Sequence, residues 1–190
     1  MTKKKFETKD LVMSAIFTAI ILVLQMLGSF IKLGPFSISL VLVPIVIGAA
    51  VCGKGIGAWL GFVFSVAVLV TDSGAFLAVN PAGTVITVLL KGTLAGFVAG
   101  YVYSLISKKN MFLAVIVAAL LCPVVNTGIF MLGCKLFFMD TLEGWAAAAG
   151  FADAASYIVY GMVGTNFLFE VLFNIILSPV IVRLLNIKKK

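Results

Sequence analysis

The chain alternates between long apolar runs and short polar connections. Six apolar segments lie at about residues 11–31, 37–51, 56–70, 82–106, 111–133 and 160–185, with Pro44 interrupting the second and Pro123 the fifth. A helix needs about 20 apolar residues to cross a bilayer, because each residue adds about 1.5 Å along its axis. The pattern predicts an all-α integral membrane protein, in which residues 1–190 form a single bundle of six transmembrane helices.

Small residues recur four apart in three of these segments. The first contains Ala15 and Ala19, and two others carry the glycine series Gly53, Gly57, Gly61 and Gly92, Gly96, Gly100. Residues four apart share one helix face, and a face of small residues lets another helix approach closely. The glycines predict close packing inside the bundle. The Ala15/Ala19 face is compatible with packing inside the bundle or with docking onto a separate membrane protein.

The last segment carries a polar stripe. Asn166, Glu170 and Asn174 follow one another at intervals of four, so they share a helix face. A carboxylate at membrane depth is costly and needs a partner or a function. The other charged residue at comparable depth is Lys91, which lies about 14 Å below the outer surface if each residue adds about 1.5 Å. Glu170 lies about as deep by the same rule.

Several further polar residues are expected near these two charges. Asn80, Thr84 and Asn126 fall in the outer half of the predicted bundle. One interpretation is a Lys91–Glu170 ion pair that seals the core, with the asparagines bonding across helices. The other is a small-molecule pocket in which Lys91 binds an anionic group and the amides hold polar atoms. The Thr84 hydroxyl could also bond back to its own helix.

The longest connection, residues 134–159, lies between the last two apolar segments. It is rich in alanine and aromatic residues. We expect either a surface connector with short interfacial helices or a lid over the pocket, in which Trp145 or Tyr157 stacks on a ligand.

Composition and charge narrow the possible functions. The chain is 63% hydrophobic and 11% charged, contains no histidine, and has a net charge of +7. In the six-helix arrangement, eleven basic residues against two acidic ones give +9 on the side of both termini, and two against four give −2 on the other. This asymmetry predicts cytoplasmic termini. Basic residues confined to ends and turns argue against nucleic-acid binding, and we expect no catalytic residues, metal site or cofactor.

One run imitates a nucleotide-binding motif. Residues 48–55 resemble the pattern G-x-x-x-x-G-K-[ST], but Gly55 stands where the Mg²⁺-binding hydroxyl belongs. The run also ends a membrane segment instead of following a buried strand. We therefore expect no ATP site in this chain.

The chain resembles the substrate-binding S components of the energy-coupling factor (ECF) vitamin transporters. Ala15-Ile-Phe-Thr-Ala19 matches the AxxxA docking motif of that family. Asn80-Pro81, Lys91-Gly92, Asn126-Thr127 and the Asn166/Glu170 helix are similar to stretches in its pantothenate-type and riboflavin-type members. The resemblance implies a multi-pass protein of the prokaryotic plasma membrane. Such a protein binds a vitamin outside and docks through the first helix onto a transmembrane coupling protein that carries two cytoplasmic ATPases.

The resemblance favours pantothenate as cargo, then riboflavin, and leaves folate and queuosine precursors open. The residues expected to bind the substrate are Asn80, Thr84, Lys91, Asn126, Trp145, Tyr157, Asn166 and Glu170. Two other functions remain as alternatives: a stand-alone transporter that uses Glu170 as a proton site, and a structural membrane subunit that binds no ligand.

Overall fold

The protein is a bundle of long, nearly parallel or antiparallel helices. The computed structural model describes residues 8–30, 32–33, 36–37 and 40–189, so the basic residues before Thr8 lie outside the described part. Five described stretches are long and apolar enough to cross a membrane. They correspond to α1 (Thr8–Gly28), α3 (Lys54–Thr71), α5 (Pro81–Ile106), α6 (Met111–Phe137) and the continuous run of α8 (Ala154–Ser156), the π-helix η1 (Tyr157–Val163) and α9 (Gly164–Lys189).

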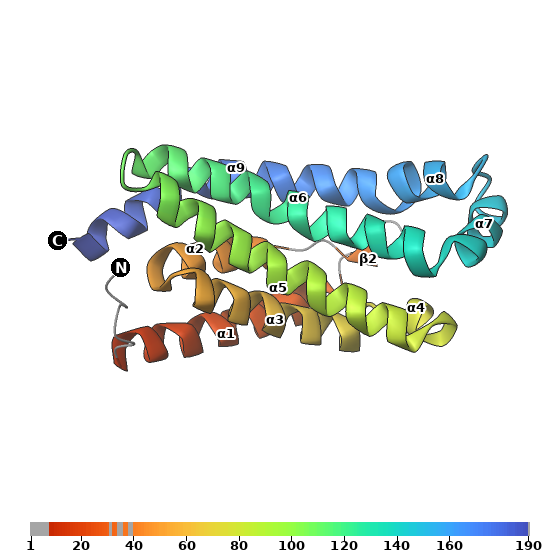
Figure 1. The fold of residues 1–190 in the computed structure, drawn as a ribbon, viewed down its shortest axis with the longest axis horizontal. Coiled ribbons are helices and arrows are strands. Elements are labelled where there is room, and N and C mark those ends of the chain that lie inside the picture. Colours follow the sequence, from red (N-terminus) through yellow and green to blue (C-terminus); the bar gives the residue numbers. More distant parts are fainter. Residues whose placement is uncertain (1–7, 31, 34–35, 38–39, 190) are drawn as a thin grey trace.

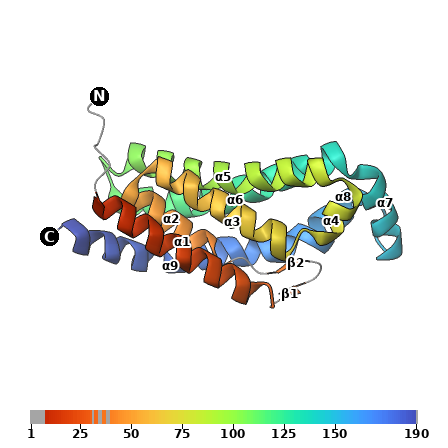
Figure 2. The same cartoon turned by 90° about the horizontal axis from the view of Figure 1, so that it is seen from below.

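The two ends of the bundle differ in the elements that they carry. The start of α1 and the end of α9 lie together at one end (Figures 1 and 2). The short helices α4 (Gly74–Val79), α7 (Met139–Ala148) and α8 lie at the other end. A two-residue antiparallel pair, β1 (Lys32–Leu33) with β2 (Phe36–Ser37), follows α1. The start of the first helix and the end of the last one lie on the same side when the number of crossings is even.

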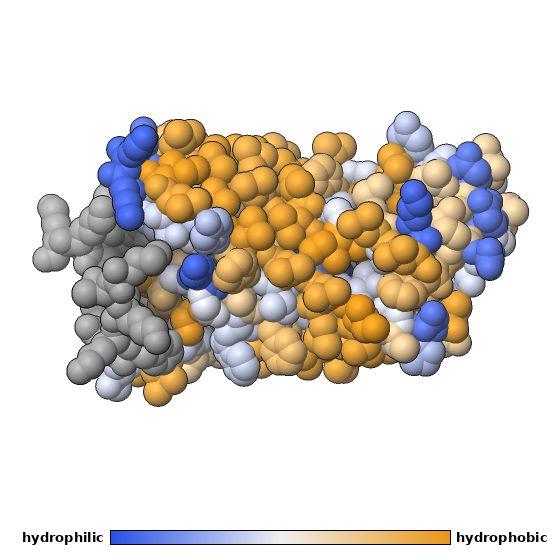
Figure 3. Space-filling view, in the orientation of Figure 1, coloured by the Kyte–Doolittle hydropathy of each residue, from blue (hydrophilic) through white to orange (hydrophobic). Residues whose placement is uncertain are grey.

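An apolar band surrounds the middle of the bundle. Figure 3 shows hydrophobic side chains over the long helices and hydrophilic side chains gathered toward both ends. Large apolar residues such as Val23, Met26 and Leu172 are more than half exposed along the helices. A soluble protein rarely exposes so broad an apolar surface, and this distribution is typical of a protein surrounded by lipid.

The second apolar segment forms a short core helix. α2 (Leu42–Cys52) has 11 residues, about 16 Å of helix at 1.5 Å per residue, which is half of a bilayer core of about 30 Å. It contacts α1, α3, α5, α6 and α9, and residues such as Ile45 and Val46 are fully buried. The structure thus confirms a helical bundle, with the short β1–β2 pair beside it and five candidate spans among the described residues. The sixth crossing stays a prediction.

One local expectation was wrong, and one short helix was not predicted. The connection at residues 71–83 contains α4, whose six residues are too few to show periodicity in the sequence. α6 continues through Pro123, where we expected an interruption. Proline removes one backbone donor, but neighbouring groups can compensate inside a packed membrane helix. The connection at 134–159 contains α7 and α8, as expected for a connector with short helices.

The glycine series form the contact between α3 and α5. A Cβ atom built on Gly57 would collide with the carbonyl oxygen of Gly96, and one built on Gly61 with that of Gly92. Gly100 lies in the same way against the backbone of Lys54. These collisions involve backbone atoms, which cannot rotate away as a side chain can. The predicted close packing is therefore confirmed for five of the six glycines. Gly53 is the exception, because a Cβ built on it would meet nothing within 4 Å.

Gly61→Ala tests this contact, with Gly55→Ala in the same helix as a matched control. A Cβ on Gly55 meets no atom within 4 Å. We expect Gly61→Ala to lower the free energy of unfolding by about 1–3 kcal/mol, since it forces two backbones apart. Gly55→Ala should be neutral or stabilising by up to about 1 kcal/mol, because alanine favours the helix. Thermal unfolding in one detergent compares them, and equal effects of the two substitutions would contradict the assigned contact.

Candidate ligand-binding site

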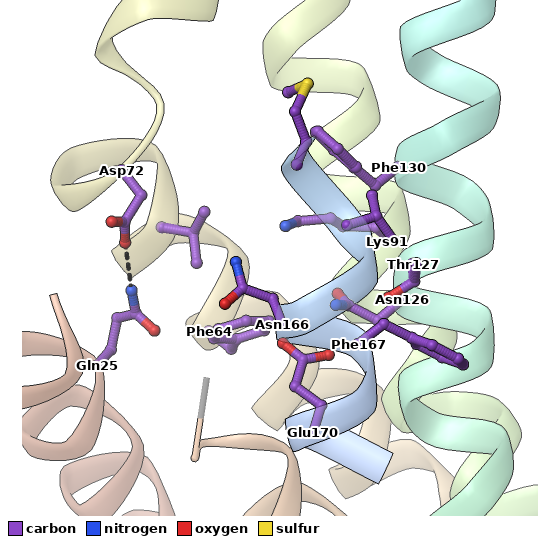
Figure 4. Close-up of a pocket in the computed structure, with 13 residues that line it drawn as sticks. Gln25, Phe64, Asp72, Lys91, Asn126, Thr127, Phe130, Asn166, Phe167 and Glu170 are labelled. Atoms are coloured by element: carbon purple, nitrogen blue, oxygen red, sulfur yellow. Dashed lines mark hydrogen bonds between the residues drawn. The ribbon is translucent and has the colours of Figure 1, made fainter. Parts of the chain in front are cut away.

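A cavity lies between the helices in the half of the bundle that carries α4 and α7. Its empty space, which includes open solvent at the mouth, is about 580 Å³. α1, α3, α5, α6, η1 and α9 each contribute to its wall (Figure 4). The lining residues are Gln25, Phe64, Val68, Asp72, Lys91, Asn126, Thr127, Phe130, Met162, Val163, Asn166, Phe167 and Glu170.

Lys91 and Glu170 both reach this cavity from different helices. The Lys91 ammonium lies 5.9 Å from the ring centroid of Phe64 and 5.4 Å from that of Phe130, so aromatic faces partly stabilise its charge. Glu170 is 7% exposed, and its Oε2 atom has no hydrogen-bond partner in the described structure. Both groups point into the shared space (Figure 4). Among the described residues they do not form the ion pair that would seal the core.

The polar stripe of α9 faces the bundle interior, as predicted. Asn166, Glu170, Asn174 and Ser178 are all at most 8% exposed. Asn166 and Glu170 line the cavity, whereas Asn174 lies one turn further along and donates its amide to the Glu170 carbonyl oxygen at 2.8 Å. Ser178 likewise donates to the Asn174 carbonyl at 2.8 Å. Two residues of the stripe, Asn166 and Glu170, therefore line the site, whereas Asn174 and Ser178 form hydrogen bonds within α9.

The π-helix η1 leads into this stripe. It spans seven residues and places Met162 and Val163 on the cavity wall. A Cβ on Gly161 would press against the ring of Tyr157, and one on Gly164 would press against the Val159 carbonyl oxygen. Glycine thus makes room at both positions. Irregular turns of this kind occur frequently at functional sites.

α6 contributes an amide to the opposite wall. Asn126 is 5% exposed, and its Oδ1 atom has no hydrogen-bond partner among the described residues. Thr127 and Phe130 follow it on the cavity side of the same helix. Lys91, Asn126, Asn166 and Glu170 were predicted to converge, and the structure brings all four to one cavity.

Sequence reasoning missed a polar contact at the cavity wall. Gln25 of α1 is 3% exposed and donates its side-chain amide to Asp72 Oδ2 at 2.7 Å, with Thr71 Oγ1 3.0 Å away. The contact ties α1 to the end of α3. A glutamine inside an apolar segment is itself a signal for such a partner, but sequence alone could not identify Asp72 as that partner.

A second, smaller cavity adjoins the first. It has about 360 Å³ of empty space and shares Val68, Asp72, Lys91 and Phe130 with the larger cavity. Thr84 lines this second cavity, and its hydroxyl donates to the Asn80 carbonyl at 2.8 Å. The bond back to its own helix, which we considered for Thr84, is therefore present.

Three predicted ligand contacts lie away from both cavities. Asn80 caps α5, because its Oδ1 accepts the Gly83 N–H at 2.9 Å. Trp145 packs edge-on against Phe76 with 5.3 Å between ring centroids, and the ring of Tyr157 is tilted against that of Phe151, also with 5.3 Å between centroids. Asn80 thus caps a helix, and Trp145 and Tyr157 pack the end of the bundle that carries α7 and α8.

The predicted docking face lies on the outside of α1. Ala15 and Ala19 are exposed, whereas Ser14, Phe17 and Ile21 on the other face are buried against the bundle. Thr18 accepts a hydrogen bond from the Trp59 indole at 3.2 Å. Both alanines are therefore exposed on the described bundle, and docking onto a separate membrane protein through this face stays a prediction.

Comparison with known proteins places this architecture in a family. Residues 9–182 match the family described as the substrate-specific component of ECF transporters. The chain belongs to this family. The S component is also 30% identical over 198 aligned positions to the pantothenic acid transporter PanT of Lactococcus lactis subsp. cremoris (strain MG1363), with 94% of each protein covered. No solved structure matches the chain.

Membership confirms the resemblance drawn from the sequence. The S component is the substrate-binding component of an ECF vitamin transporter, and its family is one of transporter components, not of enzymes. With five candidate spans among its described residues, it is a multi-pass membrane protein.

Asn80→Ala tests whether Asn80 acts as a helix cap. Loss of the cap should lower the free energy of unfolding of the S component by about 1 kcal/mol. Its ligand affinity should stay unchanged, because Asn80 does not line either cavity. Asn80→Ser, which keeps a capping oxygen, should restore most of the stability. Thermal unfolding and ligand titration give the two readouts, and a large loss of affinity at unchanged stability would contradict the capping role.

Proposed function

We propose that this chain captures pantothenate from outside the cell and holds the vitamin's carboxylate at Lys91. The observation that carries the proposal is the Lys91 ammonium, which reaches the cavity without an ion pair to any carboxylate of the described residues. A cation at membrane depth is stabilised by an anionic ligand. The similarity to PanT points to the same class of anion.

The chemistry of the wall fits pantothenate better than riboflavin. Pantothenate combines one carboxylate with an amide, two hydroxyls and a compact dimethyl group. Beside Lys91, the wall offers the amides of Asn126 and Asn166 together with apolar residues such as Phe64 and Met162. Trp145 and Tyr157, the two residues considered for stacking on a flavin, pack elsewhere. Phe64, Phe130 and Phe167 of the wall could stack on a flavin ring, but riboflavin carries no carboxylate for Lys91.

We further propose six crossings with both termini in the cytoplasm. The helix ends that lie together in Figure 1 support an even number of crossings, with α2 as part of the second. The asymmetry between basic and acidic residues assigns that end to the cytoplasm. The cavity then opens toward the outside of a prokaryotic plasma membrane.

The exposed Ala15/Ala19 face is the proposed contact with the energising module. Two alanines one turn apart leave a flat strip on which a helix of a transmembrane coupling protein can lie. The coupling protein would carry two cytoplasmic ATPases, which supply the ATP site that this chain is not expected to have. A proton-coupled transporter using Glu170 and a non-binding structural subunit are the alternatives that the experiments below separate from this proposal.

Binding of pantothenate to the purified chain is the first test. Isothermal titration in detergent should show one site, and Lys91→Met should weaken binding by about a hundredfold, since a buried charge-assisted contact is lost. Lys135→Met is the matched control, because Lys135 is exposed at the end of α6 and lines neither cavity.

Absence of pantothenate binding to folded protein would contradict the proposed cargo, and binding of riboflavin instead would replace it. A chain that binds none of the vitamins would support the structural-subunit alternative. Uptake that follows a proton gradient and needs no ATPases would support the proton-coupled transporter.

Bulky residues on the docking face should separate binding from uptake. In the double variant Ala15→Leu/Ala19→Leu, two added side chains fill the flat strip, so ATP-dependent uptake by cells should fall by more than about tenfold. Binding by the purified variant should be unchanged, because neither alanine lines the cavity. Ala82→Leu, at an exposed alanine of α5, is the control. Wild-type uptake by the double variant would contradict docking through this face.

A further inference from the structure

Unpaired oxygen atoms cluster at one part of the cavity. In the described structure, six buried side-chain oxygens lack a hydrogen-bond partner. Three of them, Asn126 Oδ1, Asn166 Oδ1 and Glu170 Oε2, belong to residues that line the larger cavity. All three residues are at most 8% exposed. A buried acceptor without a donor lowers stability, so three at one site indicate that donors are supplied by something other than this chain.

The cavity therefore offers a hydrogen-bond donor at Lys91 and hydrogen-bond acceptors at Glu170 and the two asparagines. Lys91 can only donate hydrogen bonds, and its ammonium lies between the rings of Phe64 and Phe130. An ionised Glu170 can only accept them, and it does not use Lys91 as its ion-pair partner in the described structure. A ligand that fits this arrangement carries an anion at one end and hydrogen-bond donors at the other.

We propose that Glu170, together with the amides of Asn126 and Asn166, recognises hydroxyl or N–H donors of the ligand whose anion lies at Lys91, and so determines specificity. This inference rests on the proposed function and adds an orientation to it. In pantothenate, the carboxylate and the hydroxyl-bearing pantoyl group stand at opposite ends of the molecule. The pantoyl hydroxyls then donate to the Glu170 carboxylate.

Specificity follows from the cost of leaving these acceptors unpaired. A site built to bond a hydroxyl discriminates strongly against an analogue without it, because the buried acceptor then loses its partner. A carboxylate acceptor forms a shorter and stronger bond than a neutral amide does. Glu170→Gln keeps the size of the side chain and removes its charge. It should therefore reduce the discrimination between the two ligands without abolishing ligand binding.

The experiment measures affinity for three ligands by titration of the purified chain. The ligands are pantothenate, its analogue N-(3,3-dimethylbutanoyl)-β-alanine, which lacks both hydroxyls, and panthenol, in which an alcohol replaces the carboxylate. The wild type should prefer pantothenate over the hydroxyl-free analogue by at least about a hundredfold. In Glu170→Gln this preference should fall about tenfold, with affinity for the hydroxyl-free analogue unchanged.

Lys91→Met should give the complementary result. It should weaken pantothenate binding and leave panthenol binding unchanged, because panthenol offers no anion. Glu143→Gln is the matched control for Glu170→Gln, since Glu143 is exposed and lines neither cavity. This control should bind all three ligands as the wild type does.

Two results would overturn the inference while leaving the proposed function intact. In the first, Glu170→Gln binds pantothenate as the wild type does, or loses affinity for pantothenate and the hydroxyl-free analogue by the same factor. In the second, wild-type affinity depends on Na⁺ and Glu170→Gln abolishes that dependence, which would assign the oxygens to a cation. If the folded wild type binds no pantothenate, the proposed function itself fails.

Discussion

The hydrocarbon core of a membrane offers no water to a charged side chain, and this constraint organises the protein. Lys91 and Glu170 lie on helices that a bilayer would surround, where each charge costs several kcal/mol if it has no compensation. Direct pairing would be the simplest compensation. The bundle instead keeps the two groups apart in a common cavity. The empty site therefore raises the free energy of the folded protein, and a ligand of complementary charge lowers it.

The rest of the fold makes that separation possible. The glycine contact holds α3 and α5 backbone to backbone and so fixes the helix that carries Lys91. On the other side, the wide turn of η1 precedes α9 and its stripe of polar residues. Gln25 and Asp72 connect α1 to the cavity wall, so the helix with the exposed alanine face also contributes to the site. Ligand site and proposed docking face therefore share one helix.

Sequence patterning predicted the features that repeat. Residues four positions apart predicted the polar stripe of α9, the glycine contact and the alanine face, because helix geometry places such residues on one side. The position of each residue along its helix was enough to predict that Lys91, Asn126, Asn166 and Glu170 lie close together. Patterning failed for isolated residues. An asparagine before a helix is a cap more often than a ligand contact, and Asn80 proved to be one.

The remaining parts of the site could not be predicted because they depend on tertiary packing. Nothing in the sequence pairs Gln25 with Asp72, 47 positions away. Trp145 and Tyr157 suit stacking on a ligand, but whether they reach it depends on the packing of α7 against Phe76 and of η1 against Phe151. The length of α2 and the continuity of α6 through Pro123 likewise follow from the neighbours of each helix.

An experimental structure of the chain with pantothenate bound tests the central claim most directly. The account predicts the ligand in the larger cavity, its carboxylate at the Lys91 ammonium and its hydroxyls at the Glu170 carboxylate, with the two side chains still apart. A direct Lys91–Glu170 ion pair, with the ligand bound elsewhere, would contradict it.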